Sequence, residues 1–120
     1  MNVLVIDDDV AVRNSLRYSL EAEGIDVEVA DGPEEAVRAI TRSEYDAVVT
    51  DLAMVGDGEH VLERVHVLRP GTPVIIITGD PSKAKRTSAV RNAYAILSKP
   101  FTPEGLIKLL RKATRARRRS

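Results

Sequence analysis

Five short runs of aliphatic residues recur along the chain, and each is followed by a segment with helical spacing of its apolar residues. Three of these runs are unbroken and rich in β-branched residues, a pattern typical of strands buried on both faces of a parallel sheet. In another run Val27 and Val29 alternate with polar residues, which predicts a half-buried edge strand. The predicted strands are residues 3–6, 26–30, 47–49, 74–77 and 95–97.

The segments between these runs carry the signals of helices. Val12, Leu16 and Leu20 repeat every four residues until Gly24, a residue common just after a helix. Pro33 stands in the first turn of the second predicted helix, where proline is tolerated. The apolar stripes of three later helices are Ala36, Val37 and Ile40, then Val61, Leu62, Val65 and Leu68, then Leu106, Leu109, Leu110 and Ala113.

Residues 81–92 predict a further helix that docks weakly on the sheet. Ala84, Ala89 and Val90 give this segment only a thin apolar face, beside four lysine and arginine residues. A face of this kind buries little surface and contributes little packing energy.

Strict alternation of strand and helix predicts an α/β fold with three layers, in which helices cover both faces of a parallel five-stranded sheet. Ligand sites in such folds lie beyond the carboxyl ends of the strands. The residues at these ends are Asp7, Asp8 and Asp9, then Asp31, Asp51, Thr78 and Lys99.

Composition narrows the classes of function. The 120 residues are 43% apolar, which is enough for one core, and the absence of cysteine excludes disulfides and thiolate chemistry. No run reaches the length of a membrane span and no signal peptide precedes the first strand, so we expect a cytoplasmic protein that does not bind membranes.

The formal net charge is zero, but the charged residues are distributed unevenly along the chain. Seven Lys and Arg residues and no acid lie between residues 108 and 120, so the remainder of the chain is acidic. We interpret residues 1–113 as one domain and residues 114–120 as a basic tail or linker. Such a run is usually a solvated helix end, and we expect at most weak or indirect contact with nucleic acid.

Asp7, Asp8 and Asp51 should converge at neighbouring strand ends, where their like charges oppose joint ionisation. A divalent cation relieves this conflict, and Mg²⁺ typically binds one or two carboxylates together with phosphate oxygens. A Gly-rich nucleotide-binding turn is absent after the first strand. Asp9 is expected to cap the following helix.

Thr78 and Lys99 complete the candidate site. A strand-end threonine can donate to a phosphoryl oxygen, and a lysine at the end of the fifth strand can reach the same pocket. These groups are what phosphoryl transfer to a carboxylate requires, with Asp51 as the nucleophile and Lys99 and a metal ion neutralising charge.

The segments VLVIDDD, VVTDLAM, IIITGD and LSKPF, in this order and spacing, resemble the receiver domain of two-component response regulators. The resemblance implies a flavodoxin-like (βα)5 fold with strand order 2-1-3-4-5 and phosphorylation of Asp51 by a histidine kinase or phosphotransfer protein. It further implies Mg²⁺ or Mn²⁺ held by Asp8, Asp51 and the backbone carbonyl of Ala53, with Asp7 acting through water. The peptide bond before Pro100 is expected to be cis.

The resemblance also implies an output face formed by the fourth helix, fifth strand and fifth helix, where a partner, an effector domain or a second phosphorylated copy binds. The family usually has an aromatic residue three positions before the strand-five lysine, whereas this chain has Ile96, and the nearest aromatic is Tyr94. The loop after Met54 is one residue shorter than usual. Ala53 and Asp80 occupy the positions associated with the rate of dephosphorylation.

Two other classes of protein share some of these features. A haloacid-dehalogenase-like phosphatase also uses a strand-end aspartate, but it needs a second aspartate two residues later, where this chain has Ala53. A basic-tailed interaction module lacks an aromatic platform or recognition motif. The receiver interpretation predicts a phosphoacceptor with stoichiometric self-phosphorylation and dephosphorylation rather than a turnover enzyme. His60 and His66 are interpreted as surface residues that share no metal.

Overall fold

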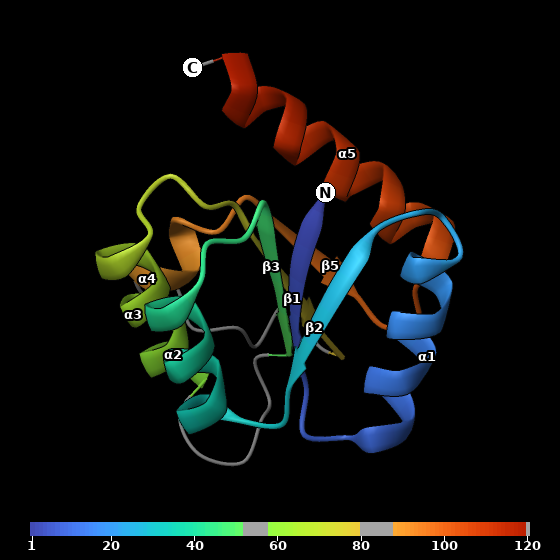
Figure 1. Ribbon diagram of the computed structural model, residues 1–120, viewed down its shortest axis with the longest axis horizontal. Coiled ribbons are helices and arrows are strands. Elements are labelled where there is room, and N and C mark those ends of the chain that lie inside the picture. The colour runs from blue at the N-terminus through green and yellow to red at the C-terminus, as the bar shows by residue number, and fades with distance from the viewer. Residues whose placement is uncertain (52–57, 80–87, 120) are drawn as a thin grey trace.

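The computed structural model describes residues 1–51, 58–79 and 88–119. Five strands alternate with five helices in this part of the chain (Figure 1). In chain order they are β1 (Asn2–Ile6), α1 (Val10–Glu21), β2 (Asp26–Ala30), α2 (Pro33–Arg42), β3 (Ala47–Asp51), α3 (Gly58–Leu68), β4 (Val74–Thr78), α4 (Ser88–Arg91), β5 (Ala95–Ser98) and α5 (Pro103–Arg119).

The strands form one parallel sheet in the order β2-β1-β3-β4-β5. Helices α1 and α5 cover one face, and α2, α3 and α4 cover the other (Figure 1). The predicted three-layer fold and its strand order are therefore confirmed. Both outer strands have one open edge, and β2 is half-buried as its alternating pattern predicts.

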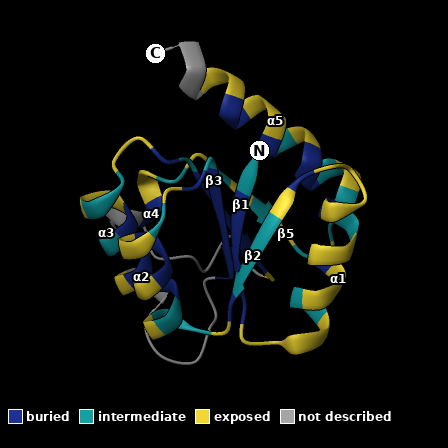
Figure 2. Cartoon of the chain, in the orientation of Figure 1, coloured by how far each residue is buried: buried dark blue, intermediate teal, exposed yellow. Residues whose placement is uncertain are grey.

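Alternate residues of the central strands supply two separate cores, because successive side chains of a strand point to opposite faces. Leu4, Ile6, Val48 and Ile76 pack with the second, third and fourth helices, while Val3, Val5, Val49, Ile75 and Ile77 pack with α1 and α5. The central strands are buried throughout, whereas the outer faces of the helices are exposed (Figure 2).

The ends of α1 follow from its flanking residues. The Asp9 carboxylate accepts hydrogen bonds from the backbone N–H groups of Ala11 at 2.9 Å and Val12 at 3.3 Å, so Asp9 is the N-cap as predicted. Beyond the helix, Gly24 has a φ of 79°, a left-handed conformation that favours glycine. The cap at Asp9 therefore fixes where the acidic segment after β1 ends and α1 begins.

The fourth predicted helix is described only in its last turn. Residues 80–87 lie outside the described part of the chain, and α4 spans Ser88–Arg91. Val90 is buried against the core shared by α2 and α3. The prediction of weak docking for residues 81–87 remains a prediction.

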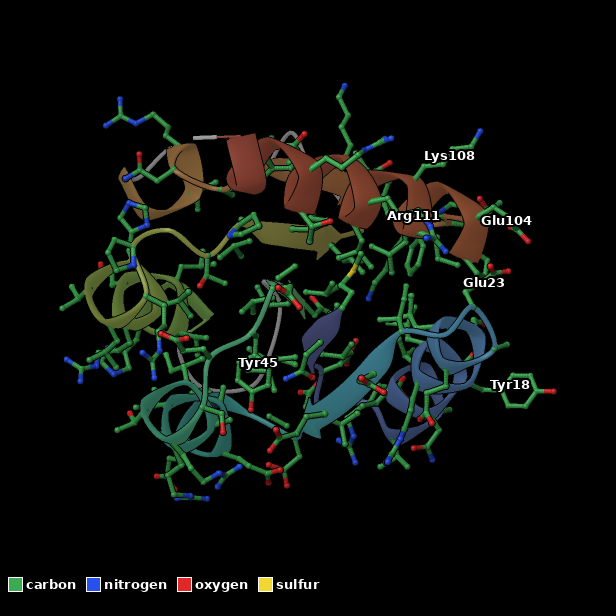
Figure 3. All side chains as sticks on the ribbon, turned by 45° about the horizontal axis from the view of Figure 1, so that its top comes forward. Tyr18, Glu23, Tyr45, Glu104, Lys108 and Arg111 are labelled. Carbon is green, nitrogen blue, oxygen red and sulfur yellow. The ribbon has the colours of Figure 1, made fainter. Side chains whose placement is uncertain are left out.

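Helix α5 continues past residue 113 without interruption, which the apolar stripe alone did not indicate. Thr114 is buried, and its hydroxyl donates to the backbone carbonyls of Leu110 and Arg111. Figure 3 shows Arg111 approaching Glu23, which follows α1, and their nearest charged atoms are 3.8 Å apart. The described part of the basic segment is helical, while the domain boundary at residue 113 stays a prediction.

Tyr45 connects the α2 layer to edge strand β2 (Figure 3). Its side chain is buried and its hydroxyl donates to Oε2 of Glu28, whose other oxygen lies 2.6 Å from Arg42. Burial, assisted by the hydrogen bond to Glu28, raises the pKa of Tyr45 to about 12. In the described segments, no helix has the length and apolar character needed to cross a membrane.

Candidate functional site

The carboxyl edge of the sheet brings together four predicted site residues. Ile6 pairs with Thr50 in the β1–β3 register, so Asp7 and Asp51 follow directly from neighbouring positions. Thr78 pairs with Ser98 in the β4–β5 register, and the Lys99 backbone N–H donates to the Thr78 carbonyl at 2.8 Å. These residues therefore meet because parallel strands end at one edge.

Lys99 reaches across β4 to Asp51. Its Nζ lies 2.8 Å from Oδ2 of Asp51, and the Asp51 side chain is 9% exposed. The hydrogen bond to Asp51 is the main cause that raises the pKa of Lys99, against the opposing effect of burial. The Lys99–Pro100 bond is cis, as the resemblance implied. A permanent cation thus lies beside the carboxylate expected to accept the phosphoryl group.

Asp7 is the most buried acid of the site, with an exposed fraction of 3%. Burial raises the pKa of Asp7, and the charges of Asp51 and Asp8 act in the same direction, although a hydrogen bond from the Asp9 backbone opposes them. That bond joins Asp9 N and Asp7 Oδ1 at 2.9 Å. Asp8, the next residue, is exposed at the rim.

The described donor set fits a magnesium ion better than a metal held wholly by side chains. Within residues 1–51, 58–79 and 88–119, no three carboxylate or imidazole side chains form a metal-binding group. Mg²⁺ needs only one or two carboxylates, since waters and a carbonyl fill its remaining positions. Burial, with the charges of Asp51 and Asp8, raises the pKa of Asp7, so a cation bound beside these acids would favour the ionised carboxylate. Ala53 and Asp80 lie outside the described residues.

Thr78 and the two candidate switch positions, Ile96 of β5 and Tyr94 just before it, occupy different environments. Thr78 is buried at the end of β4, at the same edge of the sheet as Asp51. Ile96 pairs with Ile76 in the β4–β5 register yet is 42% exposed, and Tyr94 is 38% exposed. Ile96 therefore lies on the outer strand, two residues before the Ser98 that pairs with Thr78, whereas Tyr94 lies at the opposite end of β4, where its N–H donates to the Val74 carbonyl.

Sequence reasoning missed two groups around this edge. Arg13 of α1 donates from its NH1 to the Asp7 backbone carbonyl at 2.9 Å. Glu35 of α2 has a raised pKa, chiefly because it shares a hydrogen bond with Asp31. The sequence carries only a weak signal for Arg13, its place one helical turn after Asp9, and Arg17 repeats that spacing one turn later.

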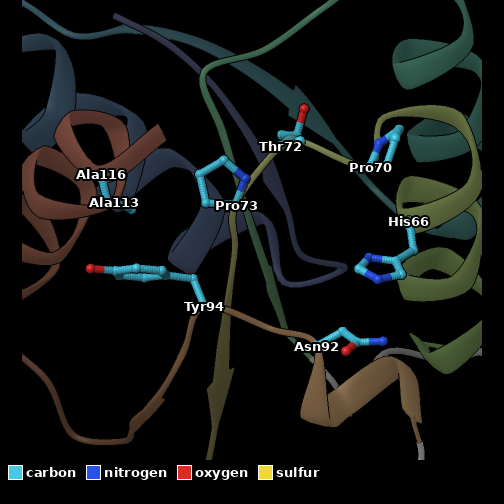
Figure 4. Close-up of a pocket in the computed structure, with 9 residues that line it drawn as sticks. His66, Pro70, Thr72, Pro73, Asn92, Tyr94, Ala113 and Ala116 are labelled. Carbon is cyan, nitrogen blue, oxygen red and sulfur yellow. The ribbon is translucent and has the colours of Figure 1, made fainter. Parts of the chain in front are cut away.

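The described part of the chain also contains hollows whose walls do not include Asp51. Figure 4 shows one of about 290 Å³ at the amino ends of the strands, with His66, Tyr94 and Pro73 in its wall. Another of about 300 Å³ lies between α2 and α3 beside His60. The two histidines therefore line separate hollows. The third, of about 470 Å³, is mainly apolar and lies between α1 and the segment after Lys99.

The amino-acid sequence is similar to those of known proteins. A family model described as the response regulator receiver domain matches residues 3–111. An NtrX-like response regulator of Rickettsia typhi is 34% identical over 94% of the chain, which spans only 25% of that protein.

Solved structures show the same architecture. A CheY-like receiver domain protein of Methanospirillum hungatei JF-1 has a TM-score of 0.92 and 28% identity, with 98% of this chain and 96% of that one covered. The TrrA response regulator of Thermotoga maritima, solved with Mg²⁺ and BeF, has a TM-score of 0.85 and 26% identity, with 93% and 97% covered.

Proposed function

We propose that this chain, which belongs to the response regulator receiver domain family, is a phosphoacceptor switch of two-component signalling and that Asp51 is its phosphoacceptor. The donor is a histidine kinase or a phosphotransfer protein. The product is a single acyl phosphate that changes how the domain binds a partner, rather than a product released in steady turnover.

The observation that carries the proposal is the contact between Lys99 Nζ and Asp51 Oδ2 at 2.8 Å, at the edge where Thr78 and Asp7 also lie. A carboxylate attacks phosphorus in line, and charge then accumulates on the equatorial oxygens. Lys99 is placed to neutralise part of this charge, and Thr78 to donate a hydrogen bond to one of these oxygens. Burial strengthens both interactions because the local dielectric is low.

Asp8, Asp51 and the Ala53 carbonyl would hold Mg²⁺ or Mn²⁺, with Asp7 acting through a bound water. The ion would supply the remaining positive charge that the transferring phosphoryl group requires. Asp7 contributes from a fixed position, since its carboxylate is already held by the Asp9 backbone at 2.9 Å. The Mg²⁺ in the related TrrA structure supports this assignment.

Output is assigned to α4, β5 and α5. Phosphorylation draws the Thr78 hydroxyl toward Asp51 and vacates space behind it. Ile96 fills this space only in part, because a β-branched side chain is short and restricted in χ1. Partners, an effector domain or a second phosphorylated copy would therefore sense movement of the α4 segment beside Tyr94. Ala53 and Asp80 are assigned to control of the water that removes the phosphoryl group.

The decisive experiment is phosphoryl uptake by Asp51→Asn. Incubation with acetyl phosphate and Mg²⁺ should add one hydroxylamine-labile phosphoryl group to the wild type, measured by intact-protein mass spectrometry, and none to the variant, because an amide is a poor nucleophile. Asp26→Asn is the matched control, since Asp26 lies at the amino end of β2. Labile phosphate on Asp51→Asn at the wild-type rate would refute the site, and steady hydrolysis of a phosphate monoester would indicate a phosphatase.

A further inference from the structure

We propose that Arg13 is a positioning residue for the magnesium site, because it fixes the peptide group that links Asp7 to Asp8. The inference rests on the proposed function and extends it to a residue of α1 that contacts neither the phosphoryl group nor the metal. Its basis is the 2.9 Å hydrogen bond from NH1 of Arg13 to the Asp7 carbonyl.

This carbonyl belongs to the planar peptide group whose nitrogen is that of Asp8. Fixing the plane restricts ψ of Asp7, and because the next amide, Asp9 N, is held by Asp7 Oδ1 at 2.9 Å, φ of Asp8 is restricted as well, and with it the direction in which the Asp8 side chain leaves the backbone. Asp8 is exposed, so packing contributes little to holding it. The contact from Arg13 adds a restraint on the backbone from which the Asp8 side chain leaves.

The contact also closes a ring of interactions around Asp8. Asp7 N donates to the Ala30 carbonyl at 3.1 Å, and Asp7 Oδ1 accepts from Asp9 N at 2.9 Å. Asp9 starts α1 by capping its first turn, and Arg13 N donates to the Asp9 carbonyl at 3.0 Å. The side chain of Arg13 then returns to Asp7. Of these interactions, the hydrogen bond from the Arg13 side chain to the Asp7 carbonyl is the one that a substitution can remove without changing an acidic residue.

Packing alone does not account for an arginine at this position. Its Nε is buried and finds no hydrogen-bond acceptor in the described part of the chain, an arrangement that costs free energy. The guanidinium therefore keeps an unsatisfied Nε while its NH1 donates to the Asp7 carbonyl at 2.9 Å.

Positioning and simple electrostatics predict opposite results for Arg13→Met. A cation near the site repels Mg²⁺, so its removal should tighten Mg²⁺ binding if charge were the only effect. If Arg13 orients Asp8, removal should instead weaken binding, and replacing groups that orient metal ligands typically costs about tenfold in affinity. The sign of the change therefore separates the two explanations.

The test is a calorimetric titration of the full chain with Mg²⁺, for wild type, Arg13→Met, Arg13→Lys and Arg17→Met. Arg17 lies one turn further along α1, exposed and paired with Glu21 at 2.7 Å, so its variant removes the same charge without touching Asp7. We expect about tenfold weaker binding for Arg13→Met, a smaller loss for Arg13→Lys, which keeps a donor and the charge, and no loss for Arg17→Met.

Two further readouts keep the result independent of overall folding. Without metal, the Asp9 amide should exchange hydrogen faster in Arg13→Met, because its acceptor Asp7 is less well held. The rate of acetyl phosphate uptake should fall at low Mg²⁺ and recover at saturating Mg²⁺. Unchanged or tighter Mg²⁺ binding in Arg13→Met, or an equal loss in Arg17→Met, would overturn the proposal. Failure of the proposed function would appear in the wild type itself, as absence of phosphoryl uptake.

Discussion

At the scale of single residues, the two buried carboxylates of the site, Asp7 and Asp51, have different hydrogen-bond partners. The Asp51 carboxylate lies 2.8 Å from the ammonium group of Lys99, whereas the Asp7 carboxylate accepts a hydrogen bond from the neutral backbone N–H of Asp9. Asp7 is nevertheless the more deeply buried of the two acids. A raised pKa for Asp7 means that the folded state without metal binds its proton more tightly than the unfolded chain does.

Asp7→Asn should therefore stabilise the protein in the absence of metal. The amide oxygen can still accept from Asp9 N, while the buried charge disappears, so we expect the free energy of unfolding to rise at neutral pH. The gain is complete above the raised pKa and vanishes below the ordinary value of 3.8, because the wild-type carboxyl is then protonated as well. Urea unfolding across this pH range measures it. Addition of Mg²⁺ should reverse the order of stability, and a variant less stable than wild type without metal would contradict this account.

At the scale of elements, the two faces of the sheet differ in how their helices are held. The α1 and α5 layer relies on apolar contacts with β1, β3 and β4. The α2 layer adds a polar connection, since Tyr45 and Arg42 both contact Glu28 of β2. This connection holds the edge strand against the layer that also carries α3 and α4.

Tyr45→Phe should weaken this connection and alter the response to alkali. Loss of the hydroxyl leaves Glu28 without one donor, which costs about 1 kcal/mol at neutral pH. Because the folded-state pKa is raised to about 12 from 10.0, the wild type loses stability as pH rises between these values, and the variant lacks this loss. Thermal unfolding at several pH values checks both effects. Tyr18→Phe is the control, because Tyr18 is 79% exposed (Figure 3), and an equal response from both variants would exclude the connection.

At the scale of the whole molecule, the candidate site and the candidate output face are joined through β4 and β5. Lys99 N bonds to the Thr78 carbonyl, and Tyr94 N bonds to the Val74 carbonyl, so each end of β5 is tied to β4. Between these ends Ile96 is 42% exposed. A structural change at Thr78 can therefore be transmitted to the outer edge of the sheet through a single strand, β5.

Hydrogen exchange with Mg²⁺ and beryllofluoride, a mimic of the acyl phosphate, should reveal this coupling. We expect the largest change in protection at Thr78 and Gly79 and in residues 88–92, because the Ile96 side chain fills only part of the space that Thr78 vacates. Thr78→Val, which keeps the shape but not the hydroxyl, should reduce the change. A response restricted to the segment just after Asp51, with α4 unaffected, would show that this face is not the output.

The sequence by itself determined the strands and most helices, because burial on one or both faces of an element leaves a period in the chain. It also placed Asp7, Asp51, Thr78 and Lys99 at one edge, since parallel strands share their carboxyl ends. The order of the strands came from the family resemblance, because alternation fixes parallel pairing and handedness but not which strands are neighbours.

Only the tertiary structure decided the contacts that depend on side-chain reach between elements. Nothing periodic distinguishes Arg13, which bonds to the Asp7 carbonyl, from Arg17, which pairs with Glu21 on the surface. The same holds for Tyr45 and Glu28, which are 17 residues apart and meet between two layers. The length of α5 was also decided by the tertiary structure, because the helix runs to Arg119, past Ala113 at the end of its apolar stripe. A hydrophobic pattern records which face is buried, whereas a polar contact depends on the distance between two particular atoms, and folding alone sets that distance.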